Sequence, residues 1–259
     1  MSPLSSKFLT LWALIFLLIL GGCTSTNTNE FAGKTSVRVE LSPTLDYLSP
    51  AIQACALQSG RLNILLEEKP ASEMGKTNAD VSLLWGDRKV PEGMRTFRLG
   101  YDRLVFAAHT DNPIDRLTVG QAFLLYRAGF ETWDEAIEQL CPDCKTGETI
   151  SGRFIEAWHY TPGTDIHAEI ASLSAAYPAS NIHRTFIAPA PANLAEALSN
   201  NPVAIGWLPA RWLNNKMKEI AIDGLDPYAQ IIPVVAAVPD QPDDLLVQWL
   251  HCLQSSYGN

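Results

Sequence analysis

Cysteine is the residue type in this 259-residue chain that could take part in the most kinds of chemistry. Two of the five cysteines are closely spaced. Cys141 and Cys144 are separated by two residues, so they could form a short disulfide, bind a metal or act as a redox pair. A zinc site usually takes ligands from two such pairs, and no second pair exists. His159 or His167 could complete a site, but their spacing does not require one, so we predict no metal site. No strand–helix pattern typical of redox enzymes surrounds the pair. A disulfide is therefore the favoured interpretation.

Acid–base and nucleophilic catalysis find little support in the sequence. In one predicted helix, His167 lies two positions from Asp165 and two from Glu169, and i, i+2 spacing directs its side chain to a different face from theirs. The chain has no Gly-x-Ser-x-Gly elbow for a nucleophilic serine and no His-Glu-x-x-His zinc motif. We therefore predict that the protein is not an enzyme and uses no cofactor.

The first 23 residues determine the expected compartment. Lys7 precedes an apolar run over residues 8–20, which is shorter than the ~20 residues of a membrane-spanning helix. Small residues follow the run, as in a secretory signal. We predict a signal peptide over residues 1–22 and a flexible polar tether over 23–34. The compartment outside the cytoplasm is oxidising, so disulfides are plausible, and Cys55 could pair with Cys252 if the terminal segments share a lobe.

Composition and charge limit the class of protein further. Hydrophobic residues make up 47% of the chain, and its 16 Gly and 17 Pro follow no repeat, which is typical of a globular protein. The net charge is −9, with 19 Lys and Arg against 28 Asp and Glu, and no basic cluster occurs. We therefore do not expect the protein to bind nucleic acid.

The elements that must position any site alternate between strands and helices. Alternating or fully apolar runs predict strands over 36–41, 61–67, 79–85, 95–109, 154–160, 203–208 and 231–238. Helical spacing and N-cap residues predict helices over 45–58, 118–128, 133–140, 165–176, 192–199 and 243–255. This order predicts an α/β fold, in which ligands bind near the carboxyl ends of strands, often at helix N-termini.

The end of the apolar run resembles a lipobox, the lipidation motif of bacterial lipoproteins. Its residues are Leu20-Gly21-Gly22-Cys23. The resemblance implies that Cys23 is acylated, with palmitate among the chains, and becomes the mature N-terminus. The protein would then be anchored by lipid to the cell membrane, facing the extracytoplasmic side. The alternative is an uncleaved N-terminal anchor with a chance cysteine.

Several segments along the body resemble the phosphate-type periplasmic solute-binding proteins, the class II receptors of ABC importers. The most specific is the stretch LTVGQAFLLYRAG followed by TW over residues 117–133. The others are Ser42-Pro43-Thr44-Leu45, Asn78-Ala79-Asp80-Val81, Thr161-Pro162-Gly163-Thr164 and the segment 197–207. The resemblance implies two α/β lobes with mixed, mostly parallel sheets and helices on both faces. Lobe 1 would comprise 35–104 and 210–259, lobe 2 would comprise 105–209, and the return to lobe 1 would bring Cys252 near Cys55.

The resemblance also implies a ligand site between the lobes. Thr44 and the N–H of Leu45 would donate from the first lobe, and the Thr161–Thr164 loop, through Gly163 and Thr164, from the second. Asp80 would accept a hydrogen bond from a protonated anion. The alternatives are that Thr44 and Thr164 are plain helix N-caps and that Asp80 is a turn residue bonded to nearby amides.

Two residues depart from the family's pattern at this site. Pro162 stands where the family has a serine, so a hydroxyl and an N–H donor are both missing. Trp158 stands where the family has an arginine, so an indole that can stack on a ligand, or pack in the core, replaces a bidentate cation. These changes put tight phosphate binding in doubt.

The resemblance and these departures together give two functional hypotheses. The first is a monomeric, lipid-anchored solute-binding protein that captures a small ligand, such as a phosphate-like oxyanion, and presents it to an ABC permease. The alternative is a non-transport lipoprotein, a ligand sensor or interaction module, that keeps the fold, has lost phosphate selectivity and acts on a membrane sensor.

Overall fold

The computed structural model describes residues 33–76, 78–86, 90, 92–145, 147–175 and 185–258. The predicted signal peptide, most of the predicted tether and Cys23 therefore lie outside the described residues. Within the described residues, no helix is both long enough and apolar enough to cross a membrane.

The strands of the described chain follow closely the pattern of apolar residues in the sequence. They are β1 (Thr35–Leu41), β2 (Leu62–Glu68), β3 (Val81–Trp85), β4 (Met94–His109), β5 (Arg116–Thr118), β6 (Glu156–Tyr160), β7 (Thr185–Ala188), β8 (Ala204–Pro209), β9 (Met217–Asp223) and β10 (Ile231–Pro239).

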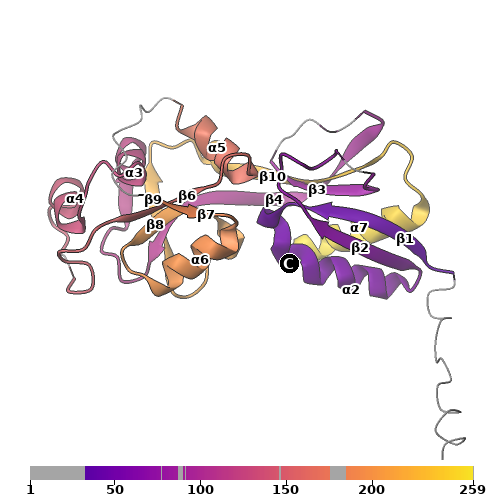
Figure 1. Ribbon diagram of the computed structural model, residues 1–259, viewed down its shortest axis with the longest axis horizontal. Helices are drawn as coiled ribbons and strands as arrows, with labels where there is room; N and C mark the ends of the chain where they lie inside the picture. The colour runs from indigo at the N-terminus through magenta and orange to yellow at the C-terminus, as the bar shows by residue number, and fades with distance from the viewer. Residues whose placement is uncertain are drawn as a thin grey trace, which may run out of the picture. The chain divides into compact units, whose positions relative to one another are not determined.

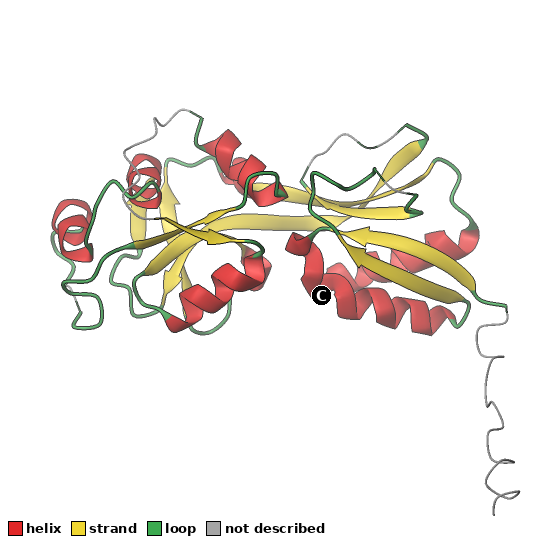
Figure 2. Ribbon diagram, viewed as in Figure 1, coloured by secondary structure: helices red, strands yellow, loops and turns green. Residues whose placement is uncertain are grey.

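Most of the described α-helices begin next to a residue whose side chain caps them. The helices are α2 (Ser49–Ser59), α3 (Val119–Tyr126), α4 (Trp133–Leu140), α5 (Asp165–Leu173), α6 (Pro191–Asn200) and α7 (Asp244–Tyr257), with short 3-10 helices η1 (Pro43–Leu48), η2 (Ala210–Trp212) and η3 (Pro227–Gln230). Side chains of Thr118, Thr132, Thr164 and Asp243 accept hydrogen bonds from the first turns of α3, α4, α5 and α7. The helices α2 and α6 have no such side-chain cap. Figure 2 shows these helices against the sheet.

The strands form a mixed sheet in the order β2-β1-β3-β10-β4-β8-β6-β7, with β9 joined to β4 and β5 to β9. The pairs β1–β3, β6–β7 and β6–β8 are parallel. The long strands β4 and β10 are antiparallel to each other and to their other neighbours. The α/β fold predicted from the sequence is therefore observed.

The long strand β4 joins two groups of elements. Its first part, Met94 to Arg103, pairs with β10, whereas Leu104 to Ala108 pairs with β8. Figure 1 shows β4 extending from the group that contains β1, β3, α2 and α7 into the group that contains β6, β8 and α6. Residues after the expected lobe boundary at residue 210 contact both groups, because Trp212 donates to the Thr44 carbonyl at 3.1 Å, whereas β9 pairs with the second part of β4 and with β5. The chain rejoins the strands of the first group only with β10.

The core consists of strands that are buried on both faces. All residues of β3 and all residues of β8 are buried, as expected where helices cover both sides of a sheet. Trp85, Trp133, Trp207 and Trp249 are among the largest fully buried side chains.

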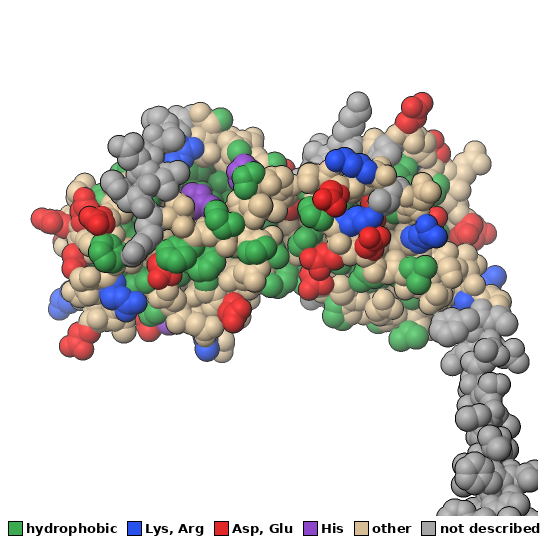
Figure 3. Space-filling view, in the orientation of Figure 1, with side chains coloured by type: hydrophobic (Ala, Val, Ile, Leu, Met, Phe, Trp, Pro, Cys, Tyr) green, Lys and Arg blue, Asp and Glu red, His purple; other side chains and the backbone are tan. Residues whose placement is uncertain are grey.

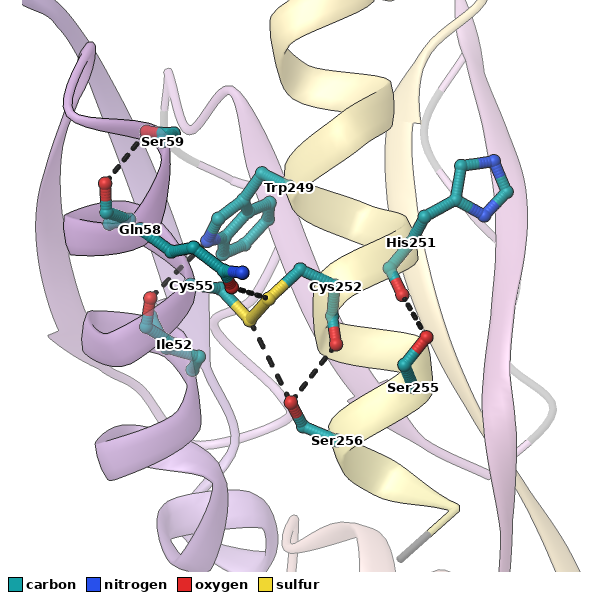
Figure 4. The surroundings of a disulfide bond; sticks show 10 residues. Ile52, Cys55, Gln58, Ser59, Trp249, His251, Cys252, Ser255 and Ser256 are labelled. Atoms are coloured by element: carbon teal, nitrogen blue, oxygen red, sulfur yellow. Dashed lines mark hydrogen bonds between the residues drawn. A yellow bond between two sulfur atoms is a disulfide. The ribbon is translucent and has the colours of Figure 1, made fainter.

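Two disulfides join the four described cysteines. Cys55 of α2 is bonded to Cys252 of α7, with the two Cα atoms 5.8 Å apart. Figure 4 shows this bond between the two helices, beside Trp249, whose indole N–H donates to the carbonyl of Ile52 at 3.3 Å. Cys141 and Cys144 form the second bond, with Cα atoms 5.3 Å apart, just after α4.

Candidate functional site

A cavity of about 340 Å³ lies where the segment after β1 meets the connection from β6 to α5. Its lining comprises residues 43–44, 70–73 and 160–166, with Pro189 and Pro191. Residues 43–44 follow the carboxyl end of β1, and residues 161–164 follow the carboxyl end of β6. The cavity therefore lies where open α/β sheets bind their ligands.

The turn after β1 orients two hydroxyl groups at this cavity. Ser42 caps η1: its Oγ accepts from the Thr44 N–H at 3.3 Å, and its carbonyl accepts from the Leu45 N–H at 2.8 Å. The indole N–H of Trp212 donates to the Thr44 carbonyl at 3.1 Å, which fixes the turn from the other side. Ser42 and Thr44 are both buried, with exposed fractions of 0% and 2%.

The connection from β6 to α5 forms the opposite wall. Gly163 has a φ of +94°, a conformation that side chains disfavour, and its missing Cβ would lie 3.5 Å from Ser72 Oγ. Thr164 caps α5, since its Oγ1 accepts from the His167 N–H at 3.3 Å and donates to the Thr161 carbonyl at 3.0 Å. The positive φ therefore favours glycine at this turn, whereas the 3.5 Å spacing from Ser72 Oγ would leave room for a Cβ.

A buried carboxylate holds the 70–73 segment in place. Glu40 of β1 accepts from Lys69 Nζ at 3.3 Å, from the Gly75 N–H at 3.0 Å and from Ser82 Oγ at 3.1 Å. Lys69 also donates its N–H to the Leu41 carbonyl at 2.9 Å. These bonds fix both ends of the segment that carries Ser72 to the cavity.

Asp165 connects the two walls. Its carboxylate accepts hydrogen bonds from Ser42 Oγ, from Thr44 Oγ1 and, at 2.9 Å, from the Ile166 N–H. It is the first residue of α5, where the helix dipole stabilises a negative charge. Its exposed fraction is only 2%, so these bonds replace most of its contact with water.

The rest of the lining is poor in groups that bind anions. None of the described residues that line the cavity is Lys, Arg or His, and five of them are prolines, which have no N–H to donate. Burial, with Tyr126 and Asp165 nearby, raises the pKa of the Tyr160 phenol well above its usual range, so it stays protonated. Its Oη is buried and has no hydrogen-bond partner among the described residues.

Four residues implicated by the sequence come together in this cavity. Thr44, Thr161, Gly163 and Thr164 all line it. Thr44 directs its hydroxyl to Asp165, and Thr164 acts as the N-cap of α5. The structure therefore brings the two predicted walls together, and whether these residues bind a ligand stays a prediction.

Leu45, also implicated by the sequence, does not line the cavity. Its side chain is fully buried, and its N–H already donates within η1 to the Ser42 carbonyl. The short hydrogen bond of the 3-10 turn therefore uses the donor that was expected to face a ligand.

Asp80 lies at the other end of the strands. It directly precedes β3, where its carboxylate accepts from the Arg38 N–H at 2.8 Å. Because β1 and β3 are parallel and Val39 pairs with Val81, Asp80 lies near the amino ends of these strands, whereas Thr44 follows the carboxyl end of β1. Asp80 therefore fits the alternative to a ligand contact, namely a turn residue whose carboxylate accepts from a nearby backbone amide.

Trp158 also lies outside the lining. Its ring stacks on Phe186 of the neighbouring strand β7, with centroids 5.2 Å apart and planes at 24°. The register pairs Trp158 with Phe186 in the parallel ladder, so packing between strands determines the orientation of the indole.

Asp165, Ser42 and Tyr160 are the polar residues of this site that sequence reasoning did not assign to it. Asp165 directly follows the Thr161–Thr164 loop, and Ser42 directly precedes Pro43 and Thr44. These positions, next to segments that resemble the family, could have identified Asp165 and Ser42 as candidates. The hydrogen bond between them spans more than 120 residues of sequence, so the sequence alone could not reveal it.

His159 cannot supply the positive charge that the lining lacks. Its ring stacks on Tyr126 at 4.1 Å, and its Nε2 lies 2.9 Å from the Tyr126 carbonyl oxygen. Burial, together with the nearby His167 and Arg127, lowers the pKa of His159 below its usual range. The imidazole is therefore neutral near pH 7.

Acid should destabilise the fold through His159. An unfolded histidine has a pKa of about 6.5, and the folded value is lower, so the stabilisation is present above that pH and is lost as the pH falls through the folded value. We expect His159→Gln to flatten the decrease in the free energy of unfolding between about pH 7 and 5, measured by urea denaturation. His251→Gln, the same change at an exposed position, should keep the wild-type slope. Equal slopes for wild type and His159→Gln would contradict this assignment.

A second hollow, of about 740 Å³, is larger, and the charged side chains of its described lining are bonded to other residues; among them, Arg211 donates to the Tyr257 carbonyl at 2.7 Å. It is lined by residues 101–103, 210–211, 228 and 231. Arg103 is paired with Glu219, and Asp102 accepts from the Trp85 indole N–H at 3.2 Å and the Arg103 N–H at 2.7 Å.

On the face drawn in Figure 3, Lys and Arg side chains lie among Asp and Glu side chains and form no continuous basic patch. No group of His, Cys, Asp and Glu in the described part of the chain could hold a metal ion.

Comparison with known proteins finds similarity in structure only. No protein-family model and no curated protein matches the sequence. A phosphate ABC transporter substrate-binding protein with bound phosphate from Clostridium perfringens has a TM-score of 0.65 at 14% identity, over 85% of this chain and 93% of that one.

Two other solved structures with the same fold are a transport receptor and a regulatory domain. An ABC-type phosphate transport receptor from Vibrio cholerae has a TM-score of 0.59 at 13% identity, over 86% of this chain and 98% of that one. The CcmR regulatory domain from Synechocystis, in complex with 2-PG, has a TM-score of 0.59 at 11% identity, with the same coverage. The chain therefore has the two-lobed class II periplasmic-binding-protein fold, which both transport receptors and regulatory domains use.

Proposed function

We propose that this protein is an extracytoplasmic, lipid-anchored binding protein that holds a small organic molecule in the 340 Å³ cavity between the η1 turn and the β6–α5 connection. The fold supports a binding function, and the cavity is of the size that small-molecule sites have. The two disulfides and the lipobox-like segment support an oxidising location outside the cytoplasm.

The ligand we propose carries hydrogen-bond donors and is neutral or cationic. The observation that carries this choice is the buried Asp165 carboxylate in a lining without Lys, Arg or His among the described residues. Glu73 adds a second carboxylate to the lining, and the prolines leave few N–H groups for an anion. A negatively charged ligand in such a site would be repelled by these carboxylates without a countercharge. An ammonium or hydroxyl group would instead find hydrogen-bond acceptors.

Of the two roles expected from the sequence, the importer receptor was the first and the sensor or interaction lipoprotein the alternative; with the contacts of Asp165 in view, we favour the alternative, a lipoprotein that acts on a membrane partner. Hydrogen bonds from Ser42 and Thr44 to Asp165 link the two walls of the cavity through the chain's own side chains. In an importer receptor, by contrast, it is the ligand that favours the closed form. The CcmR domain in complex with 2-PG is an example of this fold in a regulatory protein. The receptor of an ABC importer is the second candidate, supported by the likeness to two transport proteins.

A thermal-shift panel on the purified full-length protein in detergent tests the ligand class. Small amines, polyols and amino acids are compared with phosphate, sulfate, molybdate and tungstate, each at millimolar concentration. A ligand at about 100 times its dissociation constant adds about 2.7 kcal/mol to the free energy of unfolding. We expect such a shift with a donor-bearing organic compound and none with the oxyanions.

A matched pair of variants shows whether the shift arises at this cavity. Thr161→Phe fills the cavity from an exposed lining position and should abolish the shift. Thr149→Phe makes the same change at an exposed position outside the lining and should preserve it. A shift with phosphate alone, or a shift that survives Thr161→Phe, would count against the proposed ligand and site.

A further inference from the structure

We propose that Asp165 acts as an intramolecular anion: its carboxylate occupies the place in the cavity that a free oxyanion would take, and it thereby determines that the site rejects oxyanions. This inference rests on the proposed function and deepens it, because it assigns the selectivity of the same cavity to one residue.

The first argument is the set of donors around the carboxylate. Hydroxyl groups that follow a strand and the N–H groups of a helix N-terminus are the donors with which proteins bind free oxyanions. Here Ser42 Oγ, Thr44 Oγ1 and the Ile166 N–H all donate to Asp165. The two hydroxyls precede Asp165 by 123 and 121 residues, so donors from both walls converge on one carboxylate.

The second argument is independent of those hydrogen bonds. Tyr160 lines the same cavity, and its phenol interacts electrostatically with Asp165. The residue is 2% exposed, and its Oη has no hydrogen-bond partner among the described residues. A buried hydroxyl without a partner is costly, so its presence indicates a polar group that the cavity is built to receive. With Asp165 already negative, that group is one that tolerates a neighbouring carboxylate.

The third argument concerns charge. An oxyanion that entered the cavity would find Ser42 and Thr44 already bonded and would lie beside the negative charge of Asp165. The described lining offers it no Lys, Arg or His as compensation. Like charges at contact distance in a poorly solvated site repel strongly, so Asp165 excludes phosphate both by occupying its donors and by its own charge.

Removal of the carboxylate should therefore create an oxyanion site. Asp165→Gly deletes a CH₂–COO⁻ group, and acetate has the matching shape and charge. The variant leaves two hydroxyls and the Ile166 N–H without their acceptor, and the helix N-terminus without its negative charge. These are the groups that a small anion satisfies.

The test measures the melting midpoint of the purified full-length protein in detergent, in chloride buffers of constant ionic strength. We expect Asp165→Gly to melt at a lower temperature than wild type. Acetate and inorganic phosphate should raise its midpoint in a saturable way, with an affinity at least tenfold tighter than any wild-type response. Asp226→Gly, which removes an exposed aspartate that caps η3, serves as the matched control and should show no response to either anion.

Three results would overturn the proposal. A folded Asp165→Gly that ignores both anions overturns the proposal, as does a wild type that binds phosphate as tightly as the variant. If Asp165→Gly does not fold, Ser42→Ala combined with Thr44→Val removes both hydroxyl donors and leaves the carboxylate. A double variant that melts at the wild-type temperature would show that these bonds do not hold the carboxylate, and would refute the assignment. The response of wild type to organic ligands is scored separately, so failure here and failure of the proposed function can be told apart.

Discussion

Replacement of Cys55 and Cys252 by alanine should lower the free energy of unfolding by about 5 kcal/mol, the chain-entropy value for so long a loop. The bond joins residues that are 197 positions apart, so it greatly restricts the unfolded chain. It also connects α2 to α7, which pack against each other beside Trp249, in the part of the fold that carries β1 and Ser42. Urea denaturation of oxidised wild type and of the double variant measures the loss.

The second disulfide supplies the matched control. Cys141 and Cys144 are only three positions apart, so replacing both by alanine removes a much smaller constraint and should cost clearly less. Dithiothreitol, which reduces both bonds of wild type, should lower the free energy of unfolding by about the sum of the two losses. Equal losses for the two double variants would contradict the role given to loop length.

Truncation of Trp207 to alanine should cost about 3–5 kcal/mol, the range for large aromatic side chains deleted from a core. Trp207 is fully buried in β8, with its ring centroid 5.2 Å from that of Phe106 and 5.5 Å from that of Phe123. The deletion leaves a cavity at the centre of the strands that pair with the second part of β4. Thermal and urea unfolding both report the loss.

Two other substitutions test the physical reason. The indole Nε1 of Trp207 is buried and has no hydrogen-bond partner among the described residues, so Trp207→Phe keeps an aromatic ring and removes a costly N–H. We expect its loss to be clearly smaller than that of alanine. Tyr228→Ala removes an aromatic ring that is 81% exposed and should leave stability nearly unchanged. A loss for Tyr228→Ala as large as that for Trp207→Ala would refute the burial argument.

Asp165 gives the fold a property that its likeness to phosphate-binding proteins does not predict. The fold is shared with a phosphate-bound protein, yet identity is only 14%, and the cavity of this chain already contains a carboxylate that bonds to hydroxyls of the opposite wall. A shared fold therefore leaves the ligand undecided, and the residues that line the site must be argued one by one.

The sequence by itself determined most of the secondary structure, because periodicity and capping act over a few residues. The strand expected over 95–109 is β4 (Met94–His109), and the helix expected over 133–140 is α4. One helix expected over 45–58 is instead η1 followed by α2, with Pro50 near the start of α2, where proline is tolerated. The strand β9 was not predicted, because its buried residues Met217 and Ile220 lie three positions apart and do not show the alternation of a half-buried strand.

The site was determined by the sequence only in part. Thr44, Thr161, Gly163 and Thr164 could be found because each belongs to a short segment at the end of a strand, where local order implies position. Leu45, Asp80 and Trp158 were placed outside the cavity by a turn hydrogen bond, a strand register and a ring stack. Those contacts depend on partners that local sequence does not specify.

Only the tertiary structure decided what the cavity contains. The contacts from Ser42 and Thr44 to Asp165 bridge more than 120 residues of chain, and no pattern of residue types specifies such a meeting. It follows from the order β1-β3-β10-β4-β8-β6, which brings the carboxyl end of β1 and the N-terminus of α5 to one cavity. The sequence thus supplied the carboxylate and the hydroxyls, and the packing of the sheet made them partners, because hydrogen bonds act only at contact distance.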